Sequence, residues 1–137
     1  MPKSKKKILL DLDQTLISAE DWDKDEFKNH KDKALKFTYH DMDGYYIVFE
    51  RPGLQEFLDF LFKNFTVSIW TAASKDYAMF IIDNIILPDS KPDRKLDWVF
   101  FSYHCDISKE KKSGTKDLRT LWDEFKLSGY TQDNTVI

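Results

Sequence analysis

Four short apolar runs alternate with segments of helical periodicity, and this alternation constrains the fold more than any other feature. The runs cover residues 8–10, 65–70, 98–103 and 134–137. In the segments between them, apolar residues recur every three or four positions, as on one face of a helix. These residues are Leu54, Phe57, Leu58 and Leu61, then Tyr77, Ala78, Ile81, Ile82 and Ile85, then Leu118, Leu121, Trp122 and Phe125. Strands alternating with helices are typical of a parallel sheet covered on both faces. We therefore predict an α/β fold with a Rossmann-like sheet.

Two further segments interrupt this pattern. Residues 37–40 and 45–49 read as strands on either side of an Asp-Gly turn at 41–44, which predicts a β-hairpin insertion. Residues 18–36 are charged and poor in apolar groups, so we expect an irregular surface insertion. Alternate acids from Asp21 resemble a calcium loop, but Glu26 stands where that loop requires Gly, and we reject a calcium site.

Length and charge limit the classes of protein that fit. The chain has 137 residues, enough for one domain spanning 1–137. Its net charge of −3 gives no basic field for nucleic acid, and no apolar run approaches the roughly 20 residues of a membrane helix. The basic N-terminus lacks a signal-peptide core, so an intracellular protein is expected, either nuclear or cytoplasmic. Its cluster of lysines, from Lys3 to Lys7, is also compatible with a nuclear-import signal.

The single cysteine, Cys105, lies next to His104. One cysteine makes no internal disulfide, which agrees with a reducing compartment. On a strand over 98–103 and beyond, adjacent side chains would point to opposite faces, so this pair is not expected to form a nucleophile and its base. We expect Cys105 to be buried and neutral.

Polar residues with complementary chemistry follow the predicted strands. Asp11 and Asp13 follow the first strand, Thr71 follows the second, and a loop after the third brings Lys116 to the start of a helix. Ligands of such sheets bind at the carboxyl ends of the strands. Two close carboxylates push their pKa values apart, so one can attack as an anion while the other carries a proton. Attack on a phosphate dianion then needs cations and fixed donors, which Lys116, Thr71 and a divalent metal supply.

At these residues the sequence resembles the haloacid dehalogenase superfamily of phosphotransferases, whose Asp-x-Asp-x-Thr-Leu signature is intact over 11–16. More narrowly, it is similar to the phosphatases that act on the C-terminal tail of RNA polymerase II, the small phosphatase and Fcp-type proteins. Three stretches carry this similarity: the hairpin leading into Arg51-Pro52-Gly53, the Trp70-Thr71-Ala72 segment with Tyr77 and Ala78, and Lys116-Asp117-Leu118.

The resemblance implies a role for each matching residue. Asp11 would form the aspartyl-phosphate, and Asp13 would protonate the leaving seryl oxygen, activate water and bind Mg²⁺ through its backbone carbonyl. Asp11 and Asp13 are thus the implied metal ligands. The implied substrate-binding set is Thr15, Thr71, Ala72, Tyr77 and Lys116, of which Thr71 and Lys116 also count as catalytic. Tyr77 would line a pocket for residues beside the phosphoserine, although an aromatic residue at helical spacing is more typical of a core.

The sequence departs from the family at one point. The fourth motif is an acidic pair after the last core strand, and its first acid is a magnesium ligand. The chain stops at Ile137, where that strand would end, and Asp133 precedes the strand. Either the chain is a truncated form of a longer active protein, or it is a metal-poor and inactive fragment. The stop within an apolar strand favours the first, so we expect a single phosphatase-like domain truncated before its fourth motif.

Three functions remain open. The first is a magnesium-dependent phosphatase for phosphoserine or phosphothreonine in a protein such as the RNA polymerase II tail, with a phosphorylated protein or peptide as its partner and no direct contact with nucleic acid or membrane. The second is a non-catalytic scaffolding or binding domain of the same fold. The third is a small-molecule phosphatase. Retention of the charged site argues against the second, and the absence of a large cap insertion suits a macromolecular substrate.

Overall fold

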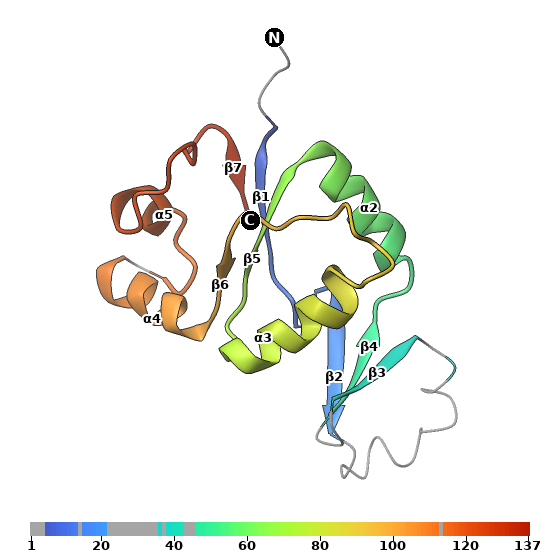
Figure 1. Ribbon diagram of the computed structural model, residues 1–137. Helices are drawn as coiled ribbons and strands as arrows, with labels where there is room; N and C mark the ends of the chain where they lie inside the picture. Colours follow the sequence, from blue (N-terminus) through green and yellow to red (C-terminus); the bar gives the residue numbers. More distant parts are fainter. Residues whose placement is uncertain (1–4, 14, 22–35, 37, 43–45, 113) are drawn as a thin grey trace.

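A four-stranded parallel sheet forms the centre of the molecule (Figure 1). The computed structural model describes residues 5–13, 15–21, 36, 38–42, 46–112 and 114–137. The strands follow the order β6-β5-β1-β7 and are β1 (Lys7–Leu10), β5 (Thr66–Trp70), β6 (Val99–Phe100) and β7 (Thr135–Val136). All three pairings are parallel, which confirms the predicted α/β fold.

Helices cover both faces of this sheet, as Figure 1 shows. One face carries α2 (Leu54–Asn64), α3 (Lys75–Ile81) and the π-helix η1 (Ile82–Ile86), and the other carries α4 (Ser102–Lys111) and α5 (Arg119–Asp123). Alternate strand residues serve opposite faces. Leu10, Val67 and Ile69 join the α2–α3 core, whereas Leu9 and Trp70 join the core beneath α4 and α5.

The two helices of the first face begin where the sequence indicates. Gly53 precedes α2 with a φ of 81°, a left-handed conformation that glycine adopts without the strain of a Cβ atom. Ser74 caps α3, because its side chain accepts a hydrogen bond from the Tyr77 backbone N–H. The helical periodicity of 77–85 continues past Ile81 in the wider π form, which the apolar spacing does not distinguish from an α-helix.

A small antiparallel sheet projects from the main sheet. It has the order β2-β4-β3, formed by β2 (Ile17–Asp21), β4 (Tyr46–Glu50) and β3 (Tyr39–Met42). The predicted hairpin is therefore present, but Asp41 and Met42 belong to a strand rather than to its turn. The expectation of an irregular segment from residue 18 is wrong for residues 18–21, which pair along β4. Backbone pairing at a sheet edge tolerates the polar side chains that suggested irregular structure.

The segment after Trp98 differs from the prediction. Only Val99 and Phe100 form a strand, and α4 begins at Ser102, so His104 and Cys105 are helical. The argument that they face opposite sides of a strand is wrong, because the apolar run continues from the strand into a helix. Cys105 is nevertheless buried as expected, and burial raises the pKa of its thiol. The following helix is also shorter than the apolar spacing indicates, since α5 ends at Asp123.

His104 is held in its neutral form at the start of α4. Its Nδ1 accepts the Phe101 backbone N–H at 3.0 Å, and the rings of Phe100 and Phe125 contact the imidazole. Burial lowers the pKa of His104. The pKa of His104 is thus lower in the folded state than in the unfolded state, where it is near 6.5. Its contribution to stability is complete at a pH above the unfolded-state pKa and is lost as the pH falls through the folded-state pKa.

We therefore expect acidification from pH 7.5 to 5.5 to lower the free energy of unfolding, measured by urea titration at each pH. His104→Phe keeps an aromatic ring but does not titrate, so it should flatten this part of the pH profile. An unchanged profile in the variant would assign the acid sensitivity to other groups.

A buried arginine joins the elements of the α2 side. Arg94 is 7% exposed, and its guanidinium donates to the Gln55 side chain, the Gln55 and Ile86 carbonyls and the Asp59 carboxylate at 2.7–3.1 Å. The Gln55 amide in turn donates to Glu50 at the end of β4. Hydrogen bonds thus connect the loop after η1, helix α2 and the small sheet.

Several expectations fall on residues outside the described ranges. They concern the calcium-loop spacing after Asp21, most of the charged insertion, the Asp-Gly turn of the hairpin and part of the N-terminal lysine cluster. Within the described ranges, no helix combines the length and apolar character needed to cross a membrane.

Candidate active site

Asp11 follows β1 directly and is held by three donors. The Lys116 ammonium donates to Oδ1 at 2.8 Å, and the Leu12 backbone N–H donates to the same oxygen at 2.9 Å. The Thr15 hydroxyl lies 3.4 Å from Oδ2. The Asp11 side chain is 40% exposed, so a substrate can reach it. Leu10 and Leu12 are buried on either side, which fixes the backbone and leaves this carboxylate at the edge of the sheet.

Asp13 lies at the junction of the two sheets. Its backbone forms an isolated bridge with Ile17, the first residue of β2. Its Oδ1 accepts a 2.6 Å hydrogen bond from the Tyr77 hydroxyl. Burial, followed by the bond to Asp13, raises the pKa of Tyr77, so the phenol stays protonated and remains a donor. The two carboxylates therefore have separate partners, a cation for Asp11 and a neutral donor for Asp13.

Thr71 follows β5, the strand beside β1, as predicted. The residue is fully buried, and its Oγ1 accepts the Ala73 backbone N–H at 3.1 Å. A hydroxyl that accepts one bond still has a hydrogen to donate. The adjacent Ala72 is exposed. The sheet thus brings Thr71 and Ala72 to the same edge as Asp11, without a hydrogen bond between Thr71 and either carboxylate.

A buried serine that the sequence did not single out positions Lys116. Ser108 of α4 is fully buried. Its hydroxyl donates to the Gly114 carbonyl at 2.6 Å and accepts a hydrogen bond from the Asp117 backbone N–H at 2.9 Å. The Thr120 hydroxyl adds a third bond at 3.1 Å. These bonds fix the turn on both sides of Lys116. Nothing in the sequence around Ser108 signals this role, because the bonds join residues brought together only by the fold.

A groove of about 480 Å³ opens beside Asp13. Tyr46 of β4 and Tyr77 of α3 form one wall, with their rings edge to face at a centroid distance of 6.3 Å. The lining residues are Asp13, Ala19, Met42, Tyr46, Ala73, Ser74, Asp76 and Tyr77. The groove therefore lies between the small sheet and α3, and the acid/base candidate Asp13 is one of its lining residues.

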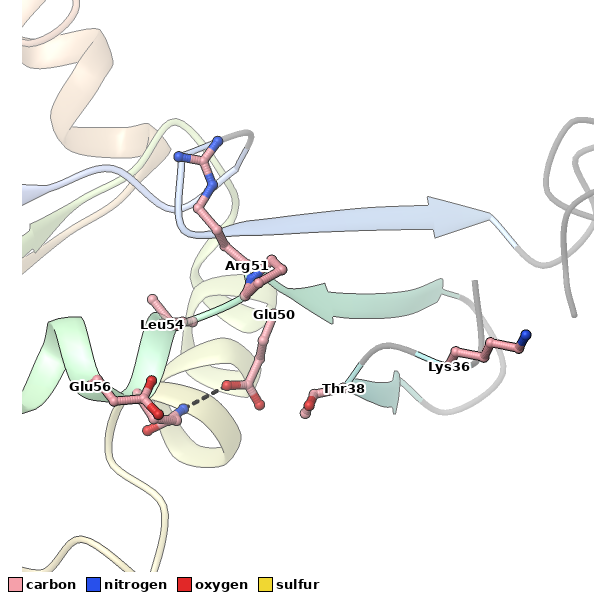
Figure 2. Close-up of a pocket in the computed structure, with 9 residues that line it drawn as sticks. Lys36, Thr38, Glu50, Arg51, Leu54 and Glu56 are labelled. Carbon is pink, nitrogen blue, oxygen red and sulfur yellow. Dashed lines mark hydrogen bonds between the residues drawn. The ribbon is translucent and has the colours of Figure 1, made fainter. Parts of the chain in front are cut away.

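A second pocket, of about 320 Å³, lies where β4 leads into α2. Glu50 and Glu56 both line it, and the Glu50 carboxylate is bonded to Gln55 and His40 at 2.7 Å each. Figure 2 shows the Arg51 guanidinium pointing away from Glu50, on the side of the turn that precedes β2, where the Arg51 backbone N–H donates to Leu16. The Glu50 carboxylate is thus engaged in bonds that hold the small sheet to α2, and we assign no chemistry to this pocket.

Of the residues that the structure describes, the Asp11 carboxylate and the Asp13 backbone carbonyl are the oxygen atoms that this edge would offer to a metal. Among the described residues, no group of three or more His, Cys, Asp and Glu side chains gathers in one place. Mg²⁺ is commonly held by one or two protein carboxylates, with water and substrate phosphate oxygens completing its shell. The donor set at this site fits that ion.

Comparison with known proteins decides the family. Residues 6–137 match the family described as NLI interacting factor-like phosphatase. The chain belongs to this family. Phosphatases of this kind are hydrolases, and the haloacid dehalogenase-type resemblance seen in the sequence is confirmed.

Two curated viral proteins are close relatives. A CTD phosphatase-like protein of Invertebrate iridescent virus 3 is 50% identical over 142 residues, which cover 99% of this chain and 76% of that protein. Its counterpart in Invertebrate iridescent virus 6 is 47% identical over 136 residues, covering 96% of this chain and 74% of that protein.

Two solved structures share the fold. The fission yeast RNA polymerase II CTD phosphatase Fcp1, as an R271A variant bound to beryllium fluoride, matches with a TM-score of 0.51 and 26% identity over 73% of this chain. A second Fcp1 structure matches with a TM-score of 0.59 and 24% identity over 97% of the chain. The chain spans only 30% and 36% of those two proteins. Together the comparisons identify a CTD phosphatase-like domain of the haloacid dehalogenase-like fold.

Proposed function

We propose that this domain is a Mg²⁺-dependent protein phosphatase that acts on phosphoserine or phosphothreonine through an aspartyl-phosphate. The observation that carries the proposal is the contact of Lys116 with Asp11, 105 residues apart, beside a second carboxyl held by a neutral hydroxyl. A lysine contributes three donors and a positive charge. This arrangement presents a cation beside Asp11, where phosphoryl oxygens would approach.

In the first step, an Asp11 oxygen forms a bond to phosphorus as the bond from phosphorus to the seryl oxygen breaks. Asp13, in its protonated form, transfers its proton to that leaving oxygen. Lys116, whose side chain is 23% exposed, donates to the phosphoryl oxygens, which carry the charge of the transition state. The products are the free hydroxyl of the peptide and phosphorylated Asp11.

In the second step, water attacks the phosphorus of the aspartyl-phosphate. Asp13, now a carboxylate, accepts a proton from that water, and the bond between phosphorus and the Asp11 oxygen breaks. Inorganic phosphate leaves, and both carboxyl groups return to their starting states. Bound through Asp11 and the Asp13 carbonyl, Mg²⁺ would neutralise charge on the phosphoryl group.

The groove beside Asp13 supports an extended peptide as the substrate. It is bounded by apolar and aromatic side chains on the small sheet and α3, and the nucleophile is 40% exposed. Apolar walls with a few polar groups suit side chains next to a phosphorylated residue. Fcp1, which is named as an RNA polymerase II CTD phosphatase, and the viral relative named as CTD phosphatase-like support the same class, a phosphorylated tail such as that of the polymerase.

The test is phosphate release from a phosphoserine peptide by the full-length protein. We expect turnover in Mg²⁺, loss of turnover after EDTA and recovery when Mg²⁺ is restored. Sugar and nucleotide phosphates, assayed in parallel, should give lower kcat/KM values. Turnover that survives EDTA would contradict the metal requirement. A higher kcat/KM for the small phosphates would indicate a small-molecule phosphatase. Absence of turnover on every substrate would favour the non-catalytic binding domain.

A further inference from the structure

The Tyr77 hydroxyl links helix α3 to the acid/base carboxyl of Asp13. It donates to Asp13 Oδ1 at 2.6 Å, a contact between residues 64 positions apart. Lys116 and Thr15 both donate to Asp11 rather than to Asp13. Within the described parts of the chain, Tyr77 is therefore the hydrogen-bond donor that the structure gives to the Asp13 side chain.

Tyr77 is itself held in place. Ser74 caps α3 by accepting the Tyr77 backbone N–H, so the residue lies in the first turn of a fixed helix. The Tyr46 ring packs against its ring edge to face. Two interactions from different elements thus restrain the backbone and the ring that carry this hydroxyl. A restrained donor can orient a carboxyl group, whereas a freely rotating donor would follow it.

The orientation matters because a carboxyl group has two oxygens and the reaction needs one of them. A neutral donor on Oδ1 fixes rotation about the last torsion of Asp13 and leaves Oδ2 for the proton. The Tyr77 hydroxyl can donate to Oδ1 whether Asp13 is protonated or ionised. The Asp13 side chain therefore need not change its orientation between the two steps. A small misplacement of a catalytic group lowers the rate strongly, so a donor that fixes the Asp13 carboxyl should support the rate.

We propose that Tyr77 is a positioning residue that holds Asp13 by Oδ1, so that Oδ2 exchanges the proton with the leaving oxygen and with water. This inference rests on the proposed function and assigns Tyr77 a role beyond lining the substrate groove.

The two steps should respond differently to loss of the hydroxyl. An aryl phosphate with a stable phenolate leaving group scarcely needs a proton in the first step, whereas hydrolysis of the aspartyl-phosphate always passes a proton to Asp13. In Tyr77→Phe, we expect the initial release of nitrophenol from p-nitrophenyl phosphate to keep its rate and approach one equivalent per site. The second, steady phase should fall about tenfold or more, which is within the range of acid–base contributions.

The matched control is Tyr39→Phe. Tyr39 lies on β3, is 43% exposed and is not among the groove residues, so removing its hydroxyl should change neither phase. Circular dichroism and melting curves should agree between the two variants. An equal fall of both phases in Tyr77→Phe would indicate a merely structural role, and no change in either phase would show that the hydroxyl is dispensable; each outcome overturns the inference.

A second comparison does not depend on the first variant alone. Asp13→Asn keeps an acceptor for Tyr77 but transfers no proton. If Tyr77 acts through Asp13, the double variant Tyr77→Phe/Asp13→Asn should be no slower than Asp13→Asn, and additive losses would refute the inference. Absence of turnover in the wild-type protein would instead refute the proposed function itself, so the two failures are distinguishable.

Discussion

Asp11→Asn should reduce turnover of an aryl phosphate in Mg²⁺ on the order of a thousandfold or more, as expected for loss of a covalent nucleophile. The amide that replaces the carboxylate forms no acyl-phosphate, and Lys116 loses the anion that it contacts at 2.8 Å. Steady-state release of nitrophenol by the full-length protein measures the loss. Nucleotide and peptide substrates should be affected alike, because the nucleophile is common to all of them.

Asp83→Asn is the matched control for this substitution. It makes the same chemical change on η1, where Asp83 is exposed, and should leave turnover unaltered. Full activity in Asp11→Asn would show that the nucleophile is wrongly assigned. The far-ultraviolet circular dichroism of both variants should match that of the wild type, because the Asp11 side chain is partly exposed and contributes little to the core.

The largest effect on stability is expected at Arg94. Arg94→Met removes the guanidinium but keeps a long apolar side chain, and it leaves the Gln55 and Ile86 carbonyls and the Gln55 side chain without their charged donor. Bonds to a buried charged group contribute more than neutral ones, and orphaned buried acceptors add a desolvation cost. We expect the free energy of unfolding in urea to fall by about 3 kcal/mol.

Lys91→Met provides a control at the same acidic partner. Lys91 and Arg94 both contact the Asp59 carboxylate, at 3.1 and 2.7 Å, but the Lys91 side chain is 37% exposed and the Arg94 side chain 4%. Exposed ion pairs contribute at most about 1 kcal/mol, so this substitution should change stability little. Equal losses in the two variants would show that the pairing with Asp59, rather than the buried carbonyl bonds, supplies the stabilisation.

The sequence predicted the elements whose signals are local. The alternation of apolar runs with helical periodicity was sufficient for the parallel sheet, and the two short runs at 37–40 and 45–49 indicated the β-hairpin. The boundaries around Phe100 were wrong because aromatic residues suit a strand and a helix face equally, so periodicity over a few residues did not separate them. Strand β2 was missed for another reason: its polar residues become a strand only through pairing with β4, which is not encoded locally.

The candidate site was predicted to a similar extent. The parallel pairing of β1 with β5 brings Asp11 and Thr71 to one edge of the sheet. Asp13 was predicted to join them because it lies two residues after Asp11. Lys116 was expected in a loop after a strand, but it follows helix α4, and Ser108 fixes its turn. The bond between Tyr77 and Asp13 had no sequence signal, since aromatic residues at helical spacing usually serve a core. Patterns of neighbouring residues in the sequence do not reveal side-chain contacts between distant segments.

The division of the site between two sheets has a consequence for how such a domain can diversify. Asp11 is anchored by the central strand and by Lys116, whereas Asp13 joins the small sheet through Ile17 and α3 through Tyr77. Under the proposed function, substitutions in β2 and β4 would reshape the wall that a peptide meets while Asp11 keeps its surroundings. Recognition of new phosphorylated sequences and retention of the bond-making chemistry would then be separable traits within this domain.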